Sequence, residues 1–521
     1  MLRKLIFCLS IFFTILIIAV VFYSEGLPGR SSSTALGDIQ TRESSNLDSI
    51  ANGREQSGRE FITLTYQDFD LPVYDQQNGT FLFCAQIVND VSVRRNIDCE
   101  IAQAVGDDGI TIAAYDQTSY RFYRIELTTL PIISIKTIGL EEAKSISREY
   151  CDALAIIFDA DSKSAGQYYI KVKLRGASSA YYPKPSYTMK FLDSCSGKET
   201  VTGILGMEPN TRYALNSLYE DESKIRDIVS LRIWQNILST TGADASKENI
   251  DMIGSEVFLN NEYMGLYGFQ EVINEYSMLN GETNQTAIYK VLNYLVPSME
   301  TLDSNSDTWD GAELAYSSID DPWAFFSELI QTIYFTDDEE FQDEIGSYLC
   351  MDNVADYYVL TSFLFATDNT WKNVVFIQTV DENGQSKLHL VPWDLDQTFG
   401  AEWMRNTDRM VVFNMERAAS EFVIREPLIF GRLWAHDVNG FRSAVAARWF
   451  ELRKGALSET ALESLISETF QTISVSGARE RDAARWPDSA TCEDNSFIEE
   501  FVRQRLAYLD GFYADILAEN G

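Results

Sequence analysis

The most informative part of the sequence is TDNTWKN at residues 367–373, followed by LVPWDLDQTFG at residues 390–400. In the first stretch, four residues separate Asp368 from Asn373. This spacing matches the D-x-x-x-x-N loop, in which the aspartate orients a hydroxyl acceptor and the asparagine binds a metal ion. The first stretch therefore predicts a loop that combines a carboxylate base with a metal ligand.

The second stretch adds two carboxylates. Asp394 and Asp396 alternate by two at the end of a strand-like run, so we expect their side chains on one face. Two carboxylates on one face are costly unless a cation or a proton neutralises them, and a bound metal would remove that cost. The nearby Phe399-Gly400 gives the segment a likeness to the D-F-G metal site. Together the two stretches predict a site for phosphoryl transfer, which needs a base and oxygen ligands for Mg²⁺.

The composition narrows the chemistry. The chain holds 78 Asp plus Glu against 42 Lys plus Arg, a formal charge of -36. Because nucleic acid needs basic patches, we expect no nucleic-acid partner, whereas basic protein partners suit an acidic chain. Only two histidines occur, which excludes His-rich metal sites and disfavours Ser-His-Asp or Cys-His catalysis. The chemistry is therefore expected to rest on carboxylates, Lys, Arg and Asn.

Seven cysteines are present and none forms a CxxC pair, so zinc ribbons and redox motifs are absent from the sequence. Cys8 lies in the apolar N-terminal segment. The other six could form up to three disulfides outside the cytoplasm, with Cys84 and Cys99 as the most local pair. Free buried thiols are the equal alternative. The six are Cys84, Cys99, Cys151, Cys195, Cys350 and Cys492.

The N-terminus begins with an apolar run at residues 5–23, which holds 19 residues without a charge. A helix of that length rises roughly 28 Å, close to the thickness of the bilayer hydrocarbon core. Arg3 and Lys4 precede the run and place that end in the cytoplasm. A cleaved signal peptide is the alternative, although its apolar region is usually shorter and ends at small residues. We therefore expect a transmembrane signal anchor over residues 1–24 and a cell-surface location for the rest.

Composition divides the rest of the chain into three parts. Residues 25–58 are rich in Ser, Gly, Thr and charge and predict a flexible linker. Short β-branched and aromatic runs at residues 59–130 are separated by Asp, Asn and Gly clusters and predict a small antiparallel β-rich domain. Residues 131–521 are expected to form the main domain, with strand-like runs first and helical segments later.

The main domain is expected to be α+β. One hairpin joins SEVFLN to MGLYGFQEV through a turn at residues 260–263, and another joins NVVFIQTV to KLHLVPWDLD. Apolar residues at helical spacing predict helices at about 222–238, 322–334 and 338–366, and the chain is expected to be helical from about 427 onward. A β-rich lobe followed by a helical lobe is the sequence order of an atypical bilobal protein-kinase-like fold.

Five stretches resemble successive blocks of the spore-coat protein H (CotH) kinase family: KVKLRGASSAYYPKPSYTMKF, LNSLYEDESKIRD, EVFLNNEYMGLYGFQEVIN, AIYKV and LVPWDLDQTFG. The resemblance covers residues from about 130 to 517. It implies an atypical, secreted-type protein kinase that binds ATP with a divalent metal, Mg²⁺ or Mn²⁺. It also implies that Asp368 is the catalytic-loop acid and that Asp394 and Asp396 serve the metal, beside Asn373.

The same resemblance suggests which residues bind ATP. The turn RGASS, which starts at Arg175, is expected to cover the nucleotide, because its Gly and hydroxyl groups could approach phosphates. A kinase also needs one Lys on the phosphates. Lys190 lies in a strand-like run and suits that role, and Lys184 lies in a loop between two prolines. A solvated lysine is the alternative for both.

Four further residues are candidate ATP contacts. Glu222 and Arg226 stand four apart on one helix face and could orient the lysine or the phosphates, although an ordinary surface pair has the same spacing. Glu271 ends the strand where the adenine hinge is expected. Lys290, in AIYKV, is the last candidate.

The sequence also departs from conventional kinases. It contains neither G-x-G-x-x-G nor a Walker A motif, so the familiar phosphate cradles are absent. Ala366-Thr367, rather than His-Arg, precedes Asp368, and the loop lysine, Lys372, follows four residues after the aspartate. A conventional protein kinase is therefore excluded, and a binding-only descendant stays open.

Three functions are compatible with these features. The first is phosphorylation of Ser or Thr on extracytoplasmic or surface proteins, with basic, Ser-rich substrates suited to an acidic enzyme. The second is a catalytically silent surface adhesin or a spore- or cell-surface assembly protein with a kinase-like fold. A metal-dependent hydrolase is the third, and it explains the RG and Lys block poorly. The complete acidic set favours the kinase.

Overall fold

The computed structural model describes most of one compact unit, residues 62–521. The anchor expected at residues 1–24 and the linker expected at 25–58 lie outside the described residues. Where the chain is described, no helix is long and apolar enough to cross a membrane. The described residues are 63–75, 79–86, 92–94, 99–100, 111–116, 121–139, 146–176, 179–241, 248–281, 284–292, 306–309, 311–370, 372–380, 384–401 and 429–519.

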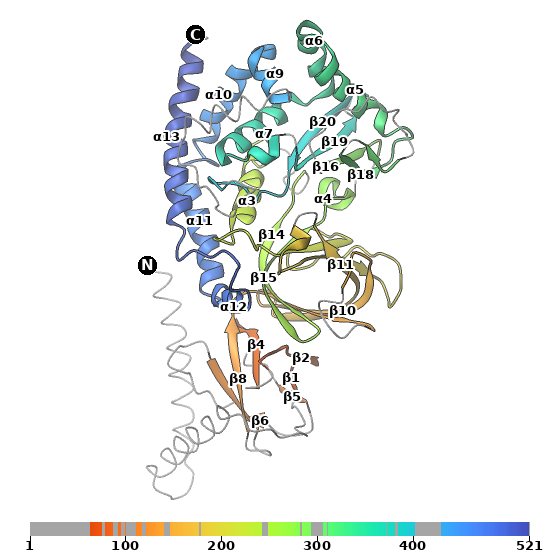
Figure 1. Ribbon diagram of the computed structural model, residues 1–521, viewed down its shortest axis with the longest axis vertical. Coiled ribbons are helices and arrows are strands. Elements are labelled where there is room, and N and C mark those ends of the chain that lie inside the picture. The colour runs from red at the N-terminus through yellow and green to blue at the C-terminus, as the bar shows by residue number, and fades with distance from the viewer. Residues whose placement is uncertain are drawn as a thin grey trace, which may run out of the picture. The chain divides into compact units, whose positions relative to one another are not determined.

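The N-terminal part consists of two small sheets (Figure 1). One has the order β2-β1-β5 and the other β3-β4-β8-β7-β6. The second sheet is mixed, because β4 and β8 pair in parallel, so the expectation of a purely antiparallel domain is wrong. Parallel neighbours need a long connection, and here β5, β6 and β7 intervene between them. The strands are β1 (Thr63–Tyr66), β2 (Phe69–Asp70), β3 (Val73–Asp75), β4 (Thr80–Cys84), β5 (Ser92–Arg94), β6 (Cys99–Glu100), β7 (Thr111–Asp116) and β8 (Arg121–Thr128).

A closed seven-stranded barrel follows, in the order β10-β11-β12-β13-β15-β14-β9. In β10 the buried positions alternate along much of the strand, as expected for a wall with one face toward a core. Closure leaves no free sheet edge, which protects the barrel from pairing with other chains. The strands are β9 (Ile132–Thr137), β10 (Cys151–Asp159), β11 (Ser164–Arg175), β12 (Ser186–Leu192), β13 (Arg212–Asn216), β14 (Met252–Leu259) and β15 (Glu262–Glu271).

The predicted β14–β15 hairpin is confirmed, and its turn explains the register. Asn260 and Asn261 have φ angles of 52° and 64°. Two consecutive residues at positive φ are typical of a type I′ turn, which matches the twist of the paired strands and favours Asn. Asn260 also accepts a hydrogen bond from the Thr137 backbone N–H at 2.8 Å, which ties the turn to the neighbouring strand β9.

The remainder of the described chain combines a further five-stranded sheet with helices, so the mixed α+β class is confirmed. The sheet has the order β17-β18-β16-β19-β20 and contains the second predicted hairpin, β19–β20. Its strands are β16 (Ala287–Val291), β17 (Thr308–Trp309), β18 (Ala312–Ser317), β19 (Val374–Val380) and β20 (Ser386–Pro392). The helices are α3 (Arg226–Leu238), α4 (Glu275–Leu279), α5 (Trp323–Phe335), α6 (Asp338–Tyr348), α7 (Met351–Leu364), α9 (Ile429–Ala435), α10 (Phe441–Leu452), α11 (Glu459–Ser474), α12 (Ala478–Arg485) and α13 (Ser496–Glu519).

Two helix boundaries differ from the prediction. The helix expected from 222 begins only at Arg226, because the Asp221 carboxylate accepts the Arg226 backbone N–H at 2.8 Å. The helix expected over 338–366 is broken between α6 and α7, where Leu349 forms a bridge with Leu388 on β20. The sequence did not reveal the break, because the apolar pattern continues across it: both helices bury apolar residues in the same core. The kinase-like bilobal arrangement and the domain boundary near residue 130 stay predictions.

Of the two alternatives for the cysteines, free thiols rather than disulfides hold among the residues that the structure describes. Cys84 is one of five free thiols there. Its sulfur lies in an apolar cluster beneath the N-terminal sheet, 3.6 Å from the Leu130 carbonyl oxygen. The local disulfide between Cys84 and Cys99 is therefore wrong, and the alternative of a buried thiol holds for Cys84. The other free thiols are Cys151, Cys195, Cys350 and Cys492.

Helix α12 packs against strand β15 of the barrel (Figure 1). Arg481 Nε lies 2.9 Å from a carboxylate oxygen of Glu256, which is fully buried on β14. The approach requires a glycine on β15, because a Cβ on Gly265 would lie 2.2 Å from Asp482 Oδ1. Gly265 also has a φ of 105°, which favours glycine.

This contact predicts a large loss of stability when Arg481 is changed to Met. The substitution removes the charged partner of the buried Glu256 carboxylate, so we expect the free energy of unfolding to fall by about 3–5 kcal/mol. Arg485→Met on the same helix is the matched control, because its partner Glu262 is half exposed. That control is expected to lose about 1 kcal/mol. Urea unfolding measures both, and equal losses would contradict the assignment.

Candidate active site

In the predicted catalytic loop, Lys372 and Asn373 both contact the carboxylate of Asp368. Helix α7 ends where Phe365 takes a left-handed φ of 55°, and a short 3₁₀ turn then carries Asp368. Lys372 Nζ lies 2.8 Å from Asp368 Oδ2, and Asn373 Nδ2 lies 3.3 Å from the same oxygen. The D-x-x-x-x-N spacing therefore brings its two ends together, with the loop lysine beside them.

The second acidic loop does not lie on a strand. Strand β20 ends at Pro392, and Asp394 has a left-handed φ of 59°. The alternation argument for Asp394 and Asp396 is therefore wrong about the backbone. The two carboxylates are still close enough to interact, because repulsion from Asp394 adds to burial in raising the pKa of Asp396. A non-glycine residue in the left-handed region costs roughly 1–2 kcal/mol, so surrounding contacts must hold it.

Asn369 supplies part of that restraint. Its side chain is fully buried, and Nδ2 donates to the Asn373 carbonyl oxygen at 3.0 Å and to that of Trp393 at 2.8 Å. The Tyr357 hydroxyl donates to the Asn369 carbonyl at 2.7 Å. One amide thus joins the two acidic loops. Sequence reasoning missed Asn369, because an Asn after an Asp reads as an ordinary turn residue.

Asp227 supplies the other restraint and was also missed. It lies in the first turn of α3, almost fully buried, and its Oδ1 accepts the Leu395 backbone N–H at 2.6 Å. Its Oδ2 accepts from Asn216 Nδ2 at 3.3 Å. This backbone N–H lies between the two aspartates of the acidic loop. The KIRD block contained the signal, but an aspartate beside Arg226 also suits a helix N-terminus.

The three aspartates carry raised pKa values. Burial and then repulsion from Asp396 and Asp394 raise the pKa of Asp227 well above its usual value. Burial and then Asp394 raise the pKa of Asp396 to about 8. For Asp394, desolvation by the surrounding protein raises the pKa and outweighs the attraction of Arg175. Part of this side chain is nevertheless exposed to solvent. The raised pKa values mean that nearby positive charge does not offset the burial and mutual repulsion of these carboxylates. A bound cation would supply further positive charge.

Two partly buried cations, Arg175 and Lys290, interact with this acidic group. Arg175 ends β11, and its pKa is lowered by burial while Asp394 and Asp227 oppose that shift. Its Nη1 is buried without a hydrogen-bond partner. Lys290 Nζ lies 4.2 Å from the centre of the Trp393 ring, and burial followed by repulsion from Arg175 lowers its pKa to about 8. An unpartnered guanidinium N–H beside a second cation suits an anionic ligand such as phosphate.

These residues fit a divalent metal with a phosphorylated ligand. Within the described ranges, no three His, Cys, Asp or Glu side chains are grouped closely enough to form a complete metal site. Mg²⁺ commonly uses one or two carboxylates and takes its other oxygens from phosphates and water. Asp394 and Asp396, with Asn373, could hold such an ion, and the orphaned Arg175 donor could bind the phosphates.

The structure gives Lys184 and Lys190 other partners. Lys184 is fully buried, with Nζ 2.5 Å from Asp482 Oδ1 on α12 and bonded to the Leu266 carbonyl. Lys190 Nζ lies 2.7 Å from Glu199 Oε1 on the barrel. The assignment of Lys184 and Lys190 to ATP stays a prediction. Lys372, beside Asp368, and Lys290 are the lysines that the fold brings near Asp394.

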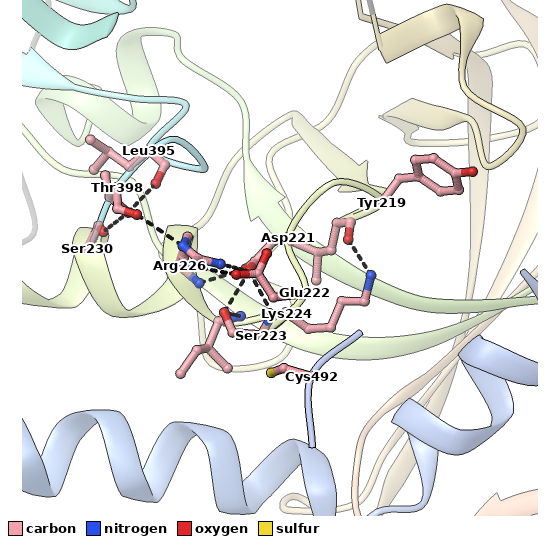
Figure 2. A network of polar contacts seen from close by, with 12 residues as sticks. Tyr219, Asp221, Glu222, Ser223, Lys224, Arg226, Ser230, Leu395, Thr398 and Cys492 are labelled. Carbon is pink, nitrogen blue, oxygen red and sulfur yellow. Dashed lines mark hydrogen bonds and ion pairs between the residues drawn. The ribbon is translucent and has the colours of Figure 1, made fainter. Parts of the chain in front are cut away.

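Glu222 and Arg226 form a buried network rather than a surface pair (Figure 2). Arg226 Nη2 lies 2.8 Å from Glu222 Oε1, and Nη1 lies 2.7 Å from Asp221 Oδ1. Its Nε donates to the Thr398 carbonyl oxygen at 3.0 Å. Figure 2 shows Arg226 pointing between the Asp221 turn and the Leu395–Thr398 loop. The arginine therefore fixes the loop that follows the two aspartates.

Glu271, the expected hinge residue, ends β15 in a buried position. Its Oε2 accepts the Asp251 backbone N–H at 2.9 Å, and Oε1 has no hydrogen-bond partner. Burial raises the pKa of Glu271 to about 8, so the carboxyl is largely protonated at neutral pH. Its contact with adenine stays a prediction.

The family model described as CotH kinase protein matches residues 172–509, which is well over half of the chain and includes every residue discussed above as part of the acidic site. The chain belongs to the CotH kinase family. Comparison with curated proteins gave no significant match.

The raised pKa of Asp396 makes stability depend on pH in a defined direction. The folded protein holds this proton up to about pH 8, whereas the unfolded chain loses it near about pH 4. Because the folded state binds the extra proton between these values, the free energy of unfolding of the metal-free protein falls as pH rises through this window. We expect Asp396→Asn to recover at least about 1 kcal/mol at the upper end.

Urea unfolding in EDTA at both ends of the window measures this effect. Asp343→Asn is the control, because Asp343 is an exposed acid on α6, away from the acidic loops. A wild-type stability that rises toward pH 8, or equal effects of the two substitutions, would contradict the raised pKa of Asp396.

Proposed function

We propose that this protein uses ATP and Mg²⁺ or Mn²⁺ to phosphorylate Ser or Thr on proteins outside the cytoplasm. The observation that carries the proposal is the opposition of charges at the site. The pKa values of Asp394, Asp396 and Asp227 stay raised although Arg175 and Lys290, two partly buried cations, lie near Asp394. A metal–nucleotide complex carries both the cation that the aspartates need and the phosphates that the two basic residues need.

The residues suit separate roles in phosphoryl transfer. Asp368 has the position of the acid that orients the acceptor hydroxyl and takes its proton, and Lys372 is close enough to neutralise charge beside it. Because Asn373 Nδ2 points to Asp368, its Oδ1 is left for a metal, with Asp394 and Asp396. Mg²⁺ or Mn²⁺, when bound, would offset the phosphate charge. Arg175 and Lys290 would position the phosphates.

The cellular setting belongs to the proposal. The apolar run at residues 5–23 would hold the protein in the membrane, with the kinase domain at the cell surface. The formal charge of -36 would favour basic, Ser-rich protein substrates through electrostatic steering. A surface-binding protein without turnover is the competing function, and the following measurement separates the two.

Transfer of label from ATP is the first test. We expect the purified full chain with Mn²⁺ or Mg²⁺ to label itself or a basic, Ser-rich peptide. Removing the base or the metal carboxylate by Asp368→Ala or Asp394→Ala should lower the rate at least about 100-fold, because general base and charge stabilisation contribute that much. Asp343→Ala, an exposed acid of α6, is the matched control and should keep the rate.

The outcomes lead to different conclusions. Labelling that survives both Asp368→Ala and Asp394→Ala would refute the site. Metal-dependent ATP binding without transfer would indicate that the true substrate is missing from the assay. An absence of both binding and transfer under either metal would overturn the proposal and favour the surface-binding function.

The two strand lysines give a second prediction. Lys290 lies beside Trp393 and Arg175, whereas Lys190 pairs with Glu199. Lys290→Met should therefore weaken metal-dependent ATP binding at least about tenfold, since it removes a charge-assisted contact. Lys190→Met should weaken it far less. Isothermal titration with a non-hydrolysable ATP analogue measures both, and a larger effect at Lys190 would return the phosphate contact to that residue.

A further inference from the structure

A second cluster of reactive side chains lies outside the acidic site. It combines Cys350, His389 and Glu248, which come from three separate elements. Cys350 precedes α7, His389 lies on β20, and Glu248 lies between α3 and β14. The sequence disfavoured Cys-His chemistry because the chain holds only two histidines. The fold nevertheless places one of them against a free thiol.

The backbone explains how the three residues meet. Leu349 and Leu388 form a parallel bridge, and the Cys350 backbone N–H donates to the Leu388 carbonyl at 3.0 Å. This pairing holds Cys350 beside the strand position that follows Leu388, which is His389. The Glu248 carboxylate approaches the same ring from another segment, with its two oxygens 3.1 and 3.2 Å from His389 Nδ1.

The contacts form a chain from carboxylate to imidazole to thiol. Glu248 occupies Nδ1 of His389, so Nε2 is the ring nitrogen left to face the neighbouring Cys350 thiol. Three side chains in this order resemble an activated nucleophile, in which a base contacts the sulfur and a third group orients the base. All three residues are partly accessible to solvent.

The charges around the sulfur favour a thiolate. Burial raises the pKa of Cys350, but the hydrogen bond and charge of His389 more than offset it, so the net shift is downward. Burial lowers the pKa of His389, yet its bonds to Cys350 and Glu248 raise it to about 10. Asp352, in the first turn of α7, opposes the thiolate, and the Asn353 backbone N–H supports it. Lys387 is directed to the Gly346 and Ser347 carbonyls.

We propose that Cys350, oriented by the His389–Glu248 pair, is a nucleophilic thiol that forms mixed disulfides with small disulfides outside the cytoplasm. The thiolate attacks one sulfur of the disulfide. A new S–S bond forms at Cys350 as the old one breaks, and the leaving sulfur departs as a thiolate that takes a proton from solvent. The disulfide itself is the oxidant, so no other co-reactant is required. This inference does not depend on the proposed kinase activity.

The test compares two cysteines in one molecule. The full chain is treated with bis(2-hydroxyethyl) disulfide, a neutral probe that the acidic surface does not repel, and adducts are measured by peptide mass spectrometry. Cys195 is the internal reference, because it is an exposed free thiol. At about pH 6, where an ordinary thiol is almost fully protonated, Cys350 should react at least about tenfold faster than Cys195.

Variants assign the effect to the cluster. His389→Gln keeps a polar side chain but cannot carry charge, and it should bring the Cys350 rate at about pH 6 down at least about tenfold. Glu248→Gln should lower it by a smaller factor. His436→Gln is the matched control, because the only other histidine pairs with Asp338 instead. Cys350→Ser should abolish the adduct at this peptide.

Two results would overturn the proposal. One is a Cys350 rate no greater than that of Cys195 in the wild-type chain. The other is an unchanged Cys350 rate in His389→Gln, checked by circular dichroism to be folded. If His389→Gln does not fold, the pH profile of the wild type decides: a rate that falls tenfold per unit from about pH 8 to 6 would show an ordinary thiol.

Discussion

Three carboxylates come close together at the acidic site, and contacts around them must oppose their mutual repulsion. Burial and then repulsion from Asp396 and Asp394 raise the pKa of Asp227, whereas Asp394 is exposed to solvent. The protein holds them by binding the backbone between them, where Leu395 N–H meets Asp227. Arg226 fixes the end of the same loop through Thr398. The site is thus preorganised around a deficit of positive charge, which a bound cation would correct.

Buried charge is also the means by which the C-terminal part is attached to the barrel. Helix α12 presents Arg481 to Glu256 and Asp482 to Lys184, and all four side chains are buried. Isolated, each of these charges would destabilise the fold, so the pairs specify where the helix must lie. This explains why Lys184, which the sequence offers as a phosphate contact, has partners without any nucleotide. The barrel and the later helices therefore belong to one compact unit.

The site was partly predictable from the sequence, and the limits have physical causes. Asp368, Asn373, Asp394 and Asp396 follow a recognisable spacing, and the hairpin turns carry Asn and Gly at positions that favour them. Asn369 and Asp227 were missed because their roles consist of hydrogen bonds to backbone groups that lie far away in the chain. A single sequence shows a side chain's chemistry but not which distant N–H or carbonyl it meets.

The sequence by itself determined the mixed α+β class, both hairpins, the acidic loop pair and the family resemblance, because these follow from local spacing and residue chemistry. The tertiary structure decided which lysine meets the acids, where the long helix breaks, and that Cys350 lies against His389. Such choices depend on strand order and barrel closure, which set contacts between residues far apart in the chain. Periodicity along a sequence carries no record of those contacts.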